Sequence, residues 1–378
     1  MDRSLILLAL VTAFYSLSST ATGIFLPNYY LQIGLGIHQI IILIASMLLV
    51  LGLIPILTLK FLPQIFEKLL ILGILLNAVF YVLLATVKEP LILGIVYGLS
   101  LATYWPAFNL LLFRLTDIKK RGLIVSLLYV TVPAFASIIG PFLGGSFIHF
   151  LGFHSLFIFG IVLLSLASAF SLKIRYAPTT RKFNIPKSHL LLLFAVIILI
   201  SGFTETSWIA YPLFLHNLTG GFFAMGILAS LLSAIFAIIS LIAGRISQVE
   251  KHRISFAFLG MLMTSIWLIS LASVHNVFQL LGISIFSGLS SAFGFSLLSL
   301  YGDFFKREQH ATLVALWETF LMCGRLANLI PVSLFITSYN FKEYFSFVGL
   351  ASLLSIIPFS VLMWLHSKGK INVDAAQK

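Results

Sequence analysis

Residues 190–200 read LLLLFAVIILI, an uninterrupted apolar run. A helix satisfies its backbone hydrogen bonds internally, which a segment surrounded by lipid requires. A transmembrane β-barrel would instead show short segments in which apolar and polar residues alternate. The run therefore predicts a membrane-spanning helix, and similar runs recur along the chain.

One helical span needs about 20 apolar residues, and the sequence contains twelve such runs, numbered here as spans 1 to 12. They are residues 4–26, 37–59, 69–87, 91–113, 123–148, 155–172, 189–215, 222–244, 254–274, 277–300, 312–336 and 345–366. The longest polar connection, residues 173–188, is too short for a folded soluble domain. We expect an all-α polytopic membrane protein with twelve transmembrane helices.

The composition supports this class. Of 378 residues, 60% are hydrophobic and 9% are charged, whereas a soluble domain has roughly 25% charged residues. The net charge of +12 could indicate nucleic acid binding. Here the cations lie in short loops between apolar runs, so the expected partner is the lipid bilayer and not a nucleic acid.

Lysine and arginine also predict the orientation. If the N-terminus is cytoplasmic, 20 of the 23 basic residues fall in cytoplasmic segments, only Lys88 and Lys342 lie outside, and Arg325 lies within a span. The positive-inside rule then places both termini in the cytoplasm, for a protein of the cell (plasma) membrane.

The two halves of the chain resemble each other in sequence. The sequence GFHSLF at 152–157 resembles NFKEYF at 340–345, and each opens the last span of its half. Pro27 and Pro212 lie near the ends of spans 1 and 7. These offsets predict two six-helix bundles, residues 1–172 and 189–378, joined by a basic linker at 173–188, a plan that transporters use.

Several motifs resemble those of the major facilitator superfamily. Residues 140–145, Gly-Pro-Phe-Leu-Gly-Gly, are similar to the Gly-Pro-x-x-Gly-Gly signature that is common in its antiporter branches. Asp117 with Arg121-Gly122 resembles the usual start of span 5, and residues 25–31 with 34–36 resemble the exit of span 1. The resemblance implies transport by rocking of two bundles around a central cavity lined by spans 1, 4, 7 and 10.

The cytoplasmic loops depart from that family pattern. The loop between spans 2 and 3, residues 60–68, lacks the usual Asp-Arg pair. The loop between spans 8 and 9 keeps Gly244 and Arg253, which the resemblance assigns to gating, but has Gln248 at the aspartate position. The cytoplasmic latch is therefore not expected in its usual form.

Charges within a bilayer are costly, at about 2.5–3.5 kcal/mol each on insertion scales. Only Glu205 in span 7 and Glu318 and Arg325 in span 11 lie well inside the spans. Glu205 and Arg325 have matching depths, and their helices are neighbours in the fold that the chain resembles, so we expect them to pair. Glu318 shares a helix face with Arg325 but lies about 10 Å away along the axis, which predicts no tight pair.

Two interpretations of this pair remain open. Burial raises the proton affinity of a carboxylate, and a nearby arginine lowers it, so Glu205 is a candidate site for a coupling proton or for substrate. The alternative is a static ion pair that ties two helices together. For Glu318 a structural or gating role is expected.

Polar and aromatic residues recur at helical spacing in the expected cavity helices. Each serine or threonine has an ordinary alternative role in helix packing. The aromatic residues and the carboxylate would suit a flat, aromatic or cationic ligand. The candidate substrate-binding residues are Tyr15, Tyr104, Trp105, Asn109, Glu205, Trp208 and Arg325.

The Gly-Pro-x-x-Gly-Gly segment has a structural explanation as well. Gly140 and Gly144 are spaced to let two helices approach closely, and Pro141 bends its helix. With Gly145, these residues are expected to give tight, kinked packing, which would also shape a hinge for alternating access.

Other functions find little support in the sequence. No ATP-binding loop, potassium-channel filter or metal-ligand spacing occurs, so no cofactor and no enzymatic activity are expected. The sequence favours a monomeric secondary active transporter of a small molecule, with proton-coupled export of amphipathic or lipophilic compounds. The alternatives are uptake of a small polar metabolite such as a sugar or organic acid and, with less support, a membrane-embedded lipid-modifying enzyme.

Overall fold

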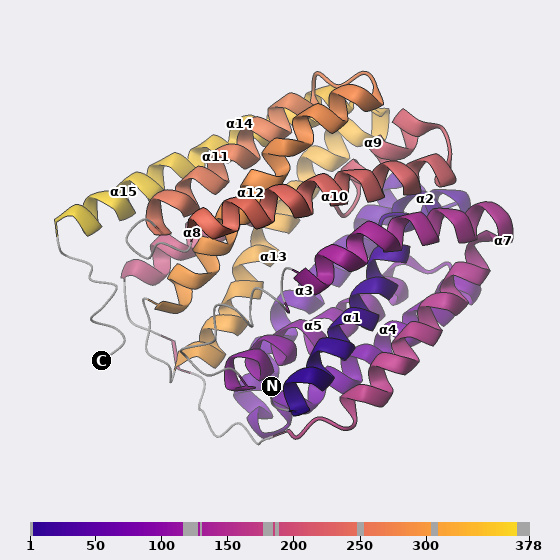
Figure 1. The fold of residues 1–378 in the computed structure, drawn as a ribbon, viewed down its shortest axis with the longest axis horizontal. Coiled ribbons are helices and arrows are strands. Elements are labelled where there is room, and N and C mark those ends of the chain that lie inside the picture. The colour runs from indigo at the N-terminus through magenta and orange to yellow at the C-terminus, as the bar shows by residue number, and fades with distance from the viewer. Residues whose placement is uncertain are drawn as a thin grey trace. The chain divides into compact units, whose positions relative to one another are not determined.

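The computed structural model describes residues 3–115, 128, 131–176, 184–185, 189–247, 253–303 and 309–368 (Figure 1). Within these ranges every regular element is helical, as predicted. The helices are α1 (Arg3–Gly23), α2 (Leu26–Gln32), α3 (Ile37–Phe61), η1 (Pro63–Lys68), α4 (Leu69–Thr86), α5 (Pro90–Leu115), α7 (Val132–Ser171), α8 (His189–Phe203), α9 (Ala210–Thr219), α10 (Phe222–Ser247), α11 (Arg253–Leu271), α12 (Val277–Asp303), α13 (His310–Phe335), η5 (Ile336–Ser338), α14 (Phe341–Ser352), η6 (Leu353–Ser355) and α15 (Ile356–Ser367).

Among the described residues, nine helical segments are long and apolar enough to cross a membrane, and His189–Phe203 and Val277–Ser290 are shorter apolar helices. The 40-residue α7 holds two spans, because Gly152 interrupts it with a φ of 79°. This left-handed conformation suits glycine, which has no Cβ to clash with the backbone. Counting α7 twice and adding the two shorter helices accounts for all twelve predicted spans.

Span 7 differs from its prediction. The sequence predicts one helix over 189–215, but α8 ends at Phe203 and α9 begins only at Ala210. Pro212 explains the break, since a proline inside a continuous helix clashes with the carbonyl four residues earlier. In the structure Pro212 instead lies in the first turn of α9, where its missing N–H costs nothing. The interruption places Glu205 and Trp208 in non-helical backbone.

The chain forms two compact units. Unit 1 comprises Met1–Lys182 and Ser207–Ala234, and unit 2 comprises Phe183–Thr206 and Ile235–Lys378. One boundary falls in the break between α8 and α9, and another falls inside α10. The linker 173–188 is described only at 173–176 and 184–185, and the six-plus-six division stays a prediction.

In unit 2, α8 and α13 approach so closely that their backbones touch. A Cβ added at Gly324 would overlap the carbonyl oxygen of Leu199 and come within 2.7 Å of the Phe203 nitrogen. A Cβ added at Gly202 would likewise overlap the Leu321 carbonyl. Small residues on both helices therefore bring the two helices together, as is common in membranes.

We predict that Gly324→Ala destabilises the protein by about 1–3 kcal/mol, the usual cost of forcing extra atoms into a packed interior. The matched control is Gly282→Ala in α12, where nothing lies within 4 Å of the new Cβ. Thermal unfolding of both variants in detergent micelles measures the difference. Equal melting temperatures for the two variants would contradict the close α8–α13 contact.

Candidate functional site

The charged site in unit 2 centres on a two-pronged ion pair between Glu205 and Arg325. The Arg325 Nε donates to Glu205 Oε2 at 2.8 Å, and Nη2 donates to Oε1 at 2.8 Å. The predicted pair is therefore present. Parallel guanidinium–carboxylate hydrogen bonds of this kind are among the strongest in proteins, and they also fix the orientation of both groups.

Glu318 joins this pair, contrary to the expectation from helix geometry. Its Oε2 lies 3.6 Å from Arg325 Nη1, although the two residues are two helical turns apart on α13. The prediction considered only the rise of the helix axis and left out the length of the two side chains. The side chains of Arg325 and Glu318 are 10% and 11% exposed, against 30% for Glu205. Two carboxylates therefore share one guanidinium.

A second layer of hydrogen bonds supports this triad. The Asn328 side-chain amide donates to the Phe203 carbonyl at 2.5 Å, at the point where α8 ends. The Tyr344 hydroxyl of α14 in turn donates to Asn328 Oδ1 at 2.8 Å. Sequence reasoning did not single out Asn328 and Tyr344. Asn328 lies three residues after Arg325, so an amide on the same face of an apolar span was the available signal.

In unit 1, three of the predicted cavity residues form one aromatic cluster. The rings of Tyr15 and Tyr104 stack with centroids 3.5 Å apart, and Trp105 meets Tyr104 edge-on at 5.3 Å. Tyr15 and Tyr104 are each only 1% exposed. Trp105 and Asn109 are partly exposed, so they present the accessible surface of this set. Trp208, also partly exposed, lies in the break before α9.

The hydroxyl groups of span 1 hold helices together. Thr22 and Tyr81 share a hydrogen bond of 2.6 Å between α1 and α4. The Ser18 hydroxyl donates to the Gly160 carbonyl of α7 at 3.1 Å. These contacts agree with the packing alternative for serine and threonine.

The Gly-Pro-x-x-Gly-Gly segment packs α7 against two neighbours within unit 1. Gly140 and Gly144 face α1, which lies along α7 (Figure 1), and a Cβ at Gly144 would overlap the carbonyl of Ala21. A Cβ at Gly145 would lie 2.7 Å from the Phe222 carbonyl and 3.1 Å from Gly226 at the start of α10. Pro141 completes the contact, because its carbonyl would be 2.5 Å from a Cβ at Gly226. The segment thus lets three helices meet backbone to backbone.

The predicted gating residues are only partly described. Gly244 lies in α10 and Arg253 begins α11, but the Arg253 side chain, Gln248, Asp117 and the Arg121-Gly122 pair lie outside the described residues.

A different ion pair lies in the loop that lacks the usual Asp-Arg motif. The Arg114 Nε donates to Glu67 Oε1 at 2.7 Å, and its Nη2 donates to the Arg175 carbonyl at 2.7 Å. The Glu67 side chain is buried, with 3% of its surface exposed. Through these two hydrogen bonds, Arg114 of α5 connects η1 to the segment after α7.

The described residues contain no group of three histidine, cysteine or acidic side chains that could hold a metal ion. The lone cysteine, Cys323 of α13, is exposed.

Two of the solved structures that resemble this fold are those of transporters. The human organic anion transporter MFSD10 (TETRAN) matches with a TM-score of 0.70 and 13% identity, covering 94% of this chain and 99% of that chain. An auto-inhibited POT family peptide transporter matches with a TM-score of 0.73 and 12% identity, covering 94% of this chain and 96% of that chain. At such identities the likeness concerns the fold alone. A search of curated protein sequences found no match.

The model of the Major Facilitator Superfamily matches this sequence twice, over residues 8–192 and again over 192–378. The two matches together span nearly the whole chain, one in each half. They agree with the all-helical, apolar architecture and with the resemblance seen in residues 140–145. The chain therefore belongs to the Major Facilitator Superfamily.

Proposed function

We propose that this membrane transporter exports amphipathic or lipophilic compounds in exchange for protons, with Glu205 as the proton-binding group. The observation that carries the proposal is the triad of Glu205, Arg325 and Glu318 inside the membrane spans. Ionisable groups at such a depth are costly, and in membrane proteins they are usually retained for function.

The charge balance of the triad favours proton binding. Two carboxylates and one guanidinium carry a net charge of −1 when all three are ionised. In a low-dielectric interior this excess charge is unfavourable, and one proton neutralises it. In the proposed cycle, movement of Arg325 away from Glu205 and back switches that carboxylate between binding and releasing a proton.

The break in span 7 supports a moving site. Interrupted helices commonly line the substrate and ion sites of secondary transporters. Glu205 lies in such an interruption, and Arg325 lies in the continuous α13. A change of backbone torsions at 204–209 would move Glu205 relative to Arg325 without bending α13.

The charges of the triad also indicate which class of substrate it would accept. The positive charge of Arg325 is already matched by two carboxylates, so the triad favours a cationic or neutral substrate over an anion. The accessible aromatic surface of Trp105 and Trp208 suits a flat or lipophilic compound. The rival proposal is uptake of a small polar metabolite, with Arg325 released from Glu205 to bind an acidic or hydroxylated group.

The close approach of α7 and α10 suggests how access alternates. Gly145 and Gly226 let these helices meet, and we propose that this contact opens and closes as the site changes sides. We further propose that the protein acts as a monomer in the cell membrane with both termini in the cytoplasm, as the distribution of lysine and arginine indicates.

The coupling role predicts that Glu205→Gln abolishes proton-driven accumulation but keeps substrate exchange, because the amide cannot release a proton. The measurement is movement of a lipophilic cation, tetraphenylphosphonium, in proteoliposomes with and without an imposed pH gradient. Glu343→Gln in α14, an exposed carboxylate, is the matched control and should behave as wild type. Wild-type transport by Glu205→Gln with an unchanged pH profile would refute the coupling role. Saturable uptake of a sugar or organic acid, without export of the cation, would favour the rival.

A double-mutant cycle on Glu205→Gln and Arg325→Gln measures how tightly the pair is linked. Arg325→Gln should be the more destabilising single change, by about 3–5 kcal/mol, because it leaves the buried Glu318 and the partly buried Glu205 without their partner. The double variant should be less destabilised than the sum of the single variants. If the destabilisations of the two single variants sum to that of the double variant within about 0.5 kcal/mol, the two side chains are not energetically coupled.

A further inference from the structure

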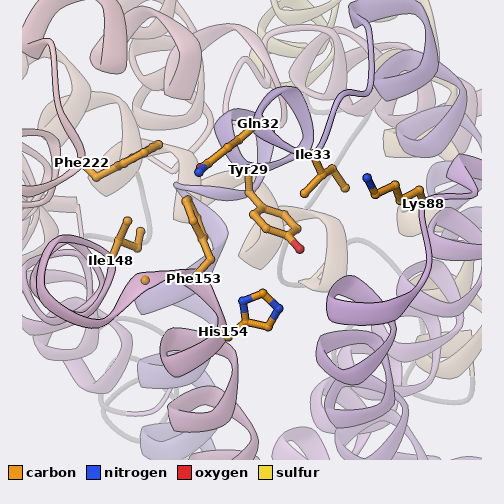
Figure 2. Close-up of a pocket in the computed structure, with 9 residues that line it drawn as sticks. Tyr29, Gln32, Ile33, Lys88, Ile148, Phe153, His154 and Phe222 are labelled. Carbon is orange, nitrogen blue, oxygen red and sulfur yellow. The ribbon is translucent and has the colours of Figure 1, made fainter.

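A cavity at one end of unit 1 shares no lining residue with the triad or with the aromatic cluster. It has a volume of about 570 Å³ and is lined by the end of α2, the connection between α4 and α5, the kink of α7 and the first residue of α10 (Figure 2). The lining residues are Tyr29, Gln32, Ile33, Lys88, Ile148, Gly152, Phe153, His154 and Phe222. A volume of this size is typical of sites for small molecules.

Aromatic rings form the wall of this cavity. The Phe153 ring packs 4.8 Å from Tyr29 and 5.1 Å from Phe222, measured between centroids. The Tyr29 hydroxyl donates to the Leu84 carbonyl at 2.6 Å, which fixes the ring in place. The left-handed Gly152 turns the chain so that Phe153 and His154 both border the cavity. This part of the wall is therefore mainly aromatic, and one of its rings is anchored by a hydrogen bond.

The polar groups at the cavity favour an anion. Lys88 carries the one permanent charge among its lining residues, and no carboxylate is part of that lining. In Figure 2 the Lys88 side chain extends toward Ile33 and Tyr29, and the His154 ring lies near Tyr29. The exposed side chains of Lys88, Gln32 and His154 can all donate hydrogen bonds. Glu89 follows Lys88 in the chain but does not border the cavity.

The surroundings indicate a ligand that is apolar as well as charged. Phe150 and Leu151, just before the kink, are 71% and 63% exposed, so apolar surface continues beside the cavity. In the proposed orientation Lys88 is at the outer end of the helices, where the hydrocarbon region meets water. A compound with an apolar tail and an anionic head would match both parts of this environment.

We propose that this cavity binds an anionic amphiphile, with a phosphate or carboxylate head on Lys88, His154 and Gln32 and an apolar part against Phe153 and Phe222. The chemistry of this cavity differs from that of the proposed transport site, whose charge balance favours cationic or neutral compounds. Its ligand is either a soluble amphiphilic anion or the headgroup of an anionic lipid, and the two share the same recognition chemistry.

The test titrates the purified full-length protein, in an uncharged detergent, with hexyl phosphate, hexanol and inorganic phosphate, and follows the thermal unfolding temperature. A ligand that binds only the folded state raises this temperature in a saturable manner. Hexyl phosphate should do so, whereas hexanol lacks the head and inorganic phosphate lacks the tail, so both should bind far more weakly. Equal effects of hexanol and hexyl phosphate would overturn the proposal.

Substitutions at two exposed positions test whether hexyl phosphate binds in this cavity. Lys88→Gln should weaken hexyl phosphate binding about tenfold, since it removes a charge-assisted hydrogen bond, and His154→Gln should weaken it less. The matched control is Lys342→Gln on α14, which removes the other outer lysine outside the cavity and should bind as wild type. Unchanged binding by Lys88→Gln, with the variant folded as judged by its melting temperature, would refute the site.

A competition experiment identifies the source of the ligand. Protein in nanodiscs of phosphatidylcholine is compared with protein in nanodiscs that also contain phosphatidylglycerol. If phosphatidylglycerol weakens hexyl phosphate binding to wild type but not the residual binding to Lys88→Gln, the occupant is a lipid headgroup. Equal binding in both membranes assigns the site to a soluble anion. Loss of proton-driven transport in Glu205→Gln bears on the transport proposal alone and leaves this test unaffected.

Discussion

The guanidinium of Arg325, held between Glu205 and Glu318 inside apolar helices, is the interaction on which the arrangement of unit 2 depends. A charge in the hydrocarbon region needs a partner within reach, and the ion pair with Glu205 holds the segment after α8 against α13. Gly202 and Gly324 make that contact close enough for the backbones to touch. The Asn328 amide then binds the Phe203 carbonyl at the end of α8. The close α8–α13 contact, the capped end of α8 and the buried Arg325 are thus connected by direct contacts.

In unit 1, glycine residues also allow helices to pack closely. Gly140, Gly144 and Gly145 let α7 meet both α1 and the start of α10. In lipid the hydrophobic effect does not drive helices together, so van der Waals contact between closely packed backbones and hydrogen bonds must stabilise the bundle.

The two proposed sites differ chemically. The triad places two carboxylates around one guanidinium, whereas the cavity near Lys88 combines a cation with aromatic walls at one end of unit 1. A transporter with these two environments would distinguish the compound that it moves from an amphiphile that occupies the membrane boundary.

The sequence by itself determined the helical class and predicted twelve spans, because lipid imposes helices. Matching depths along the spans, together with the fold that the chain resembles, predicted the Glu205–Arg325 pair. Tertiary structure decided the break at 204–209, the approach of Glu318 to Arg325, the Asn328–Tyr344 support and the Glu67–Arg114 pair. These depend on side-chain reach and on which helices touch, and spacing along one helix does not contain that information. Pro212 was the one local signal of the break, and its effect became clear only where the helix restarted around it. A cavity such as the one beside Lys88 arises from four separate segments, so only the folded chain brings its walls together.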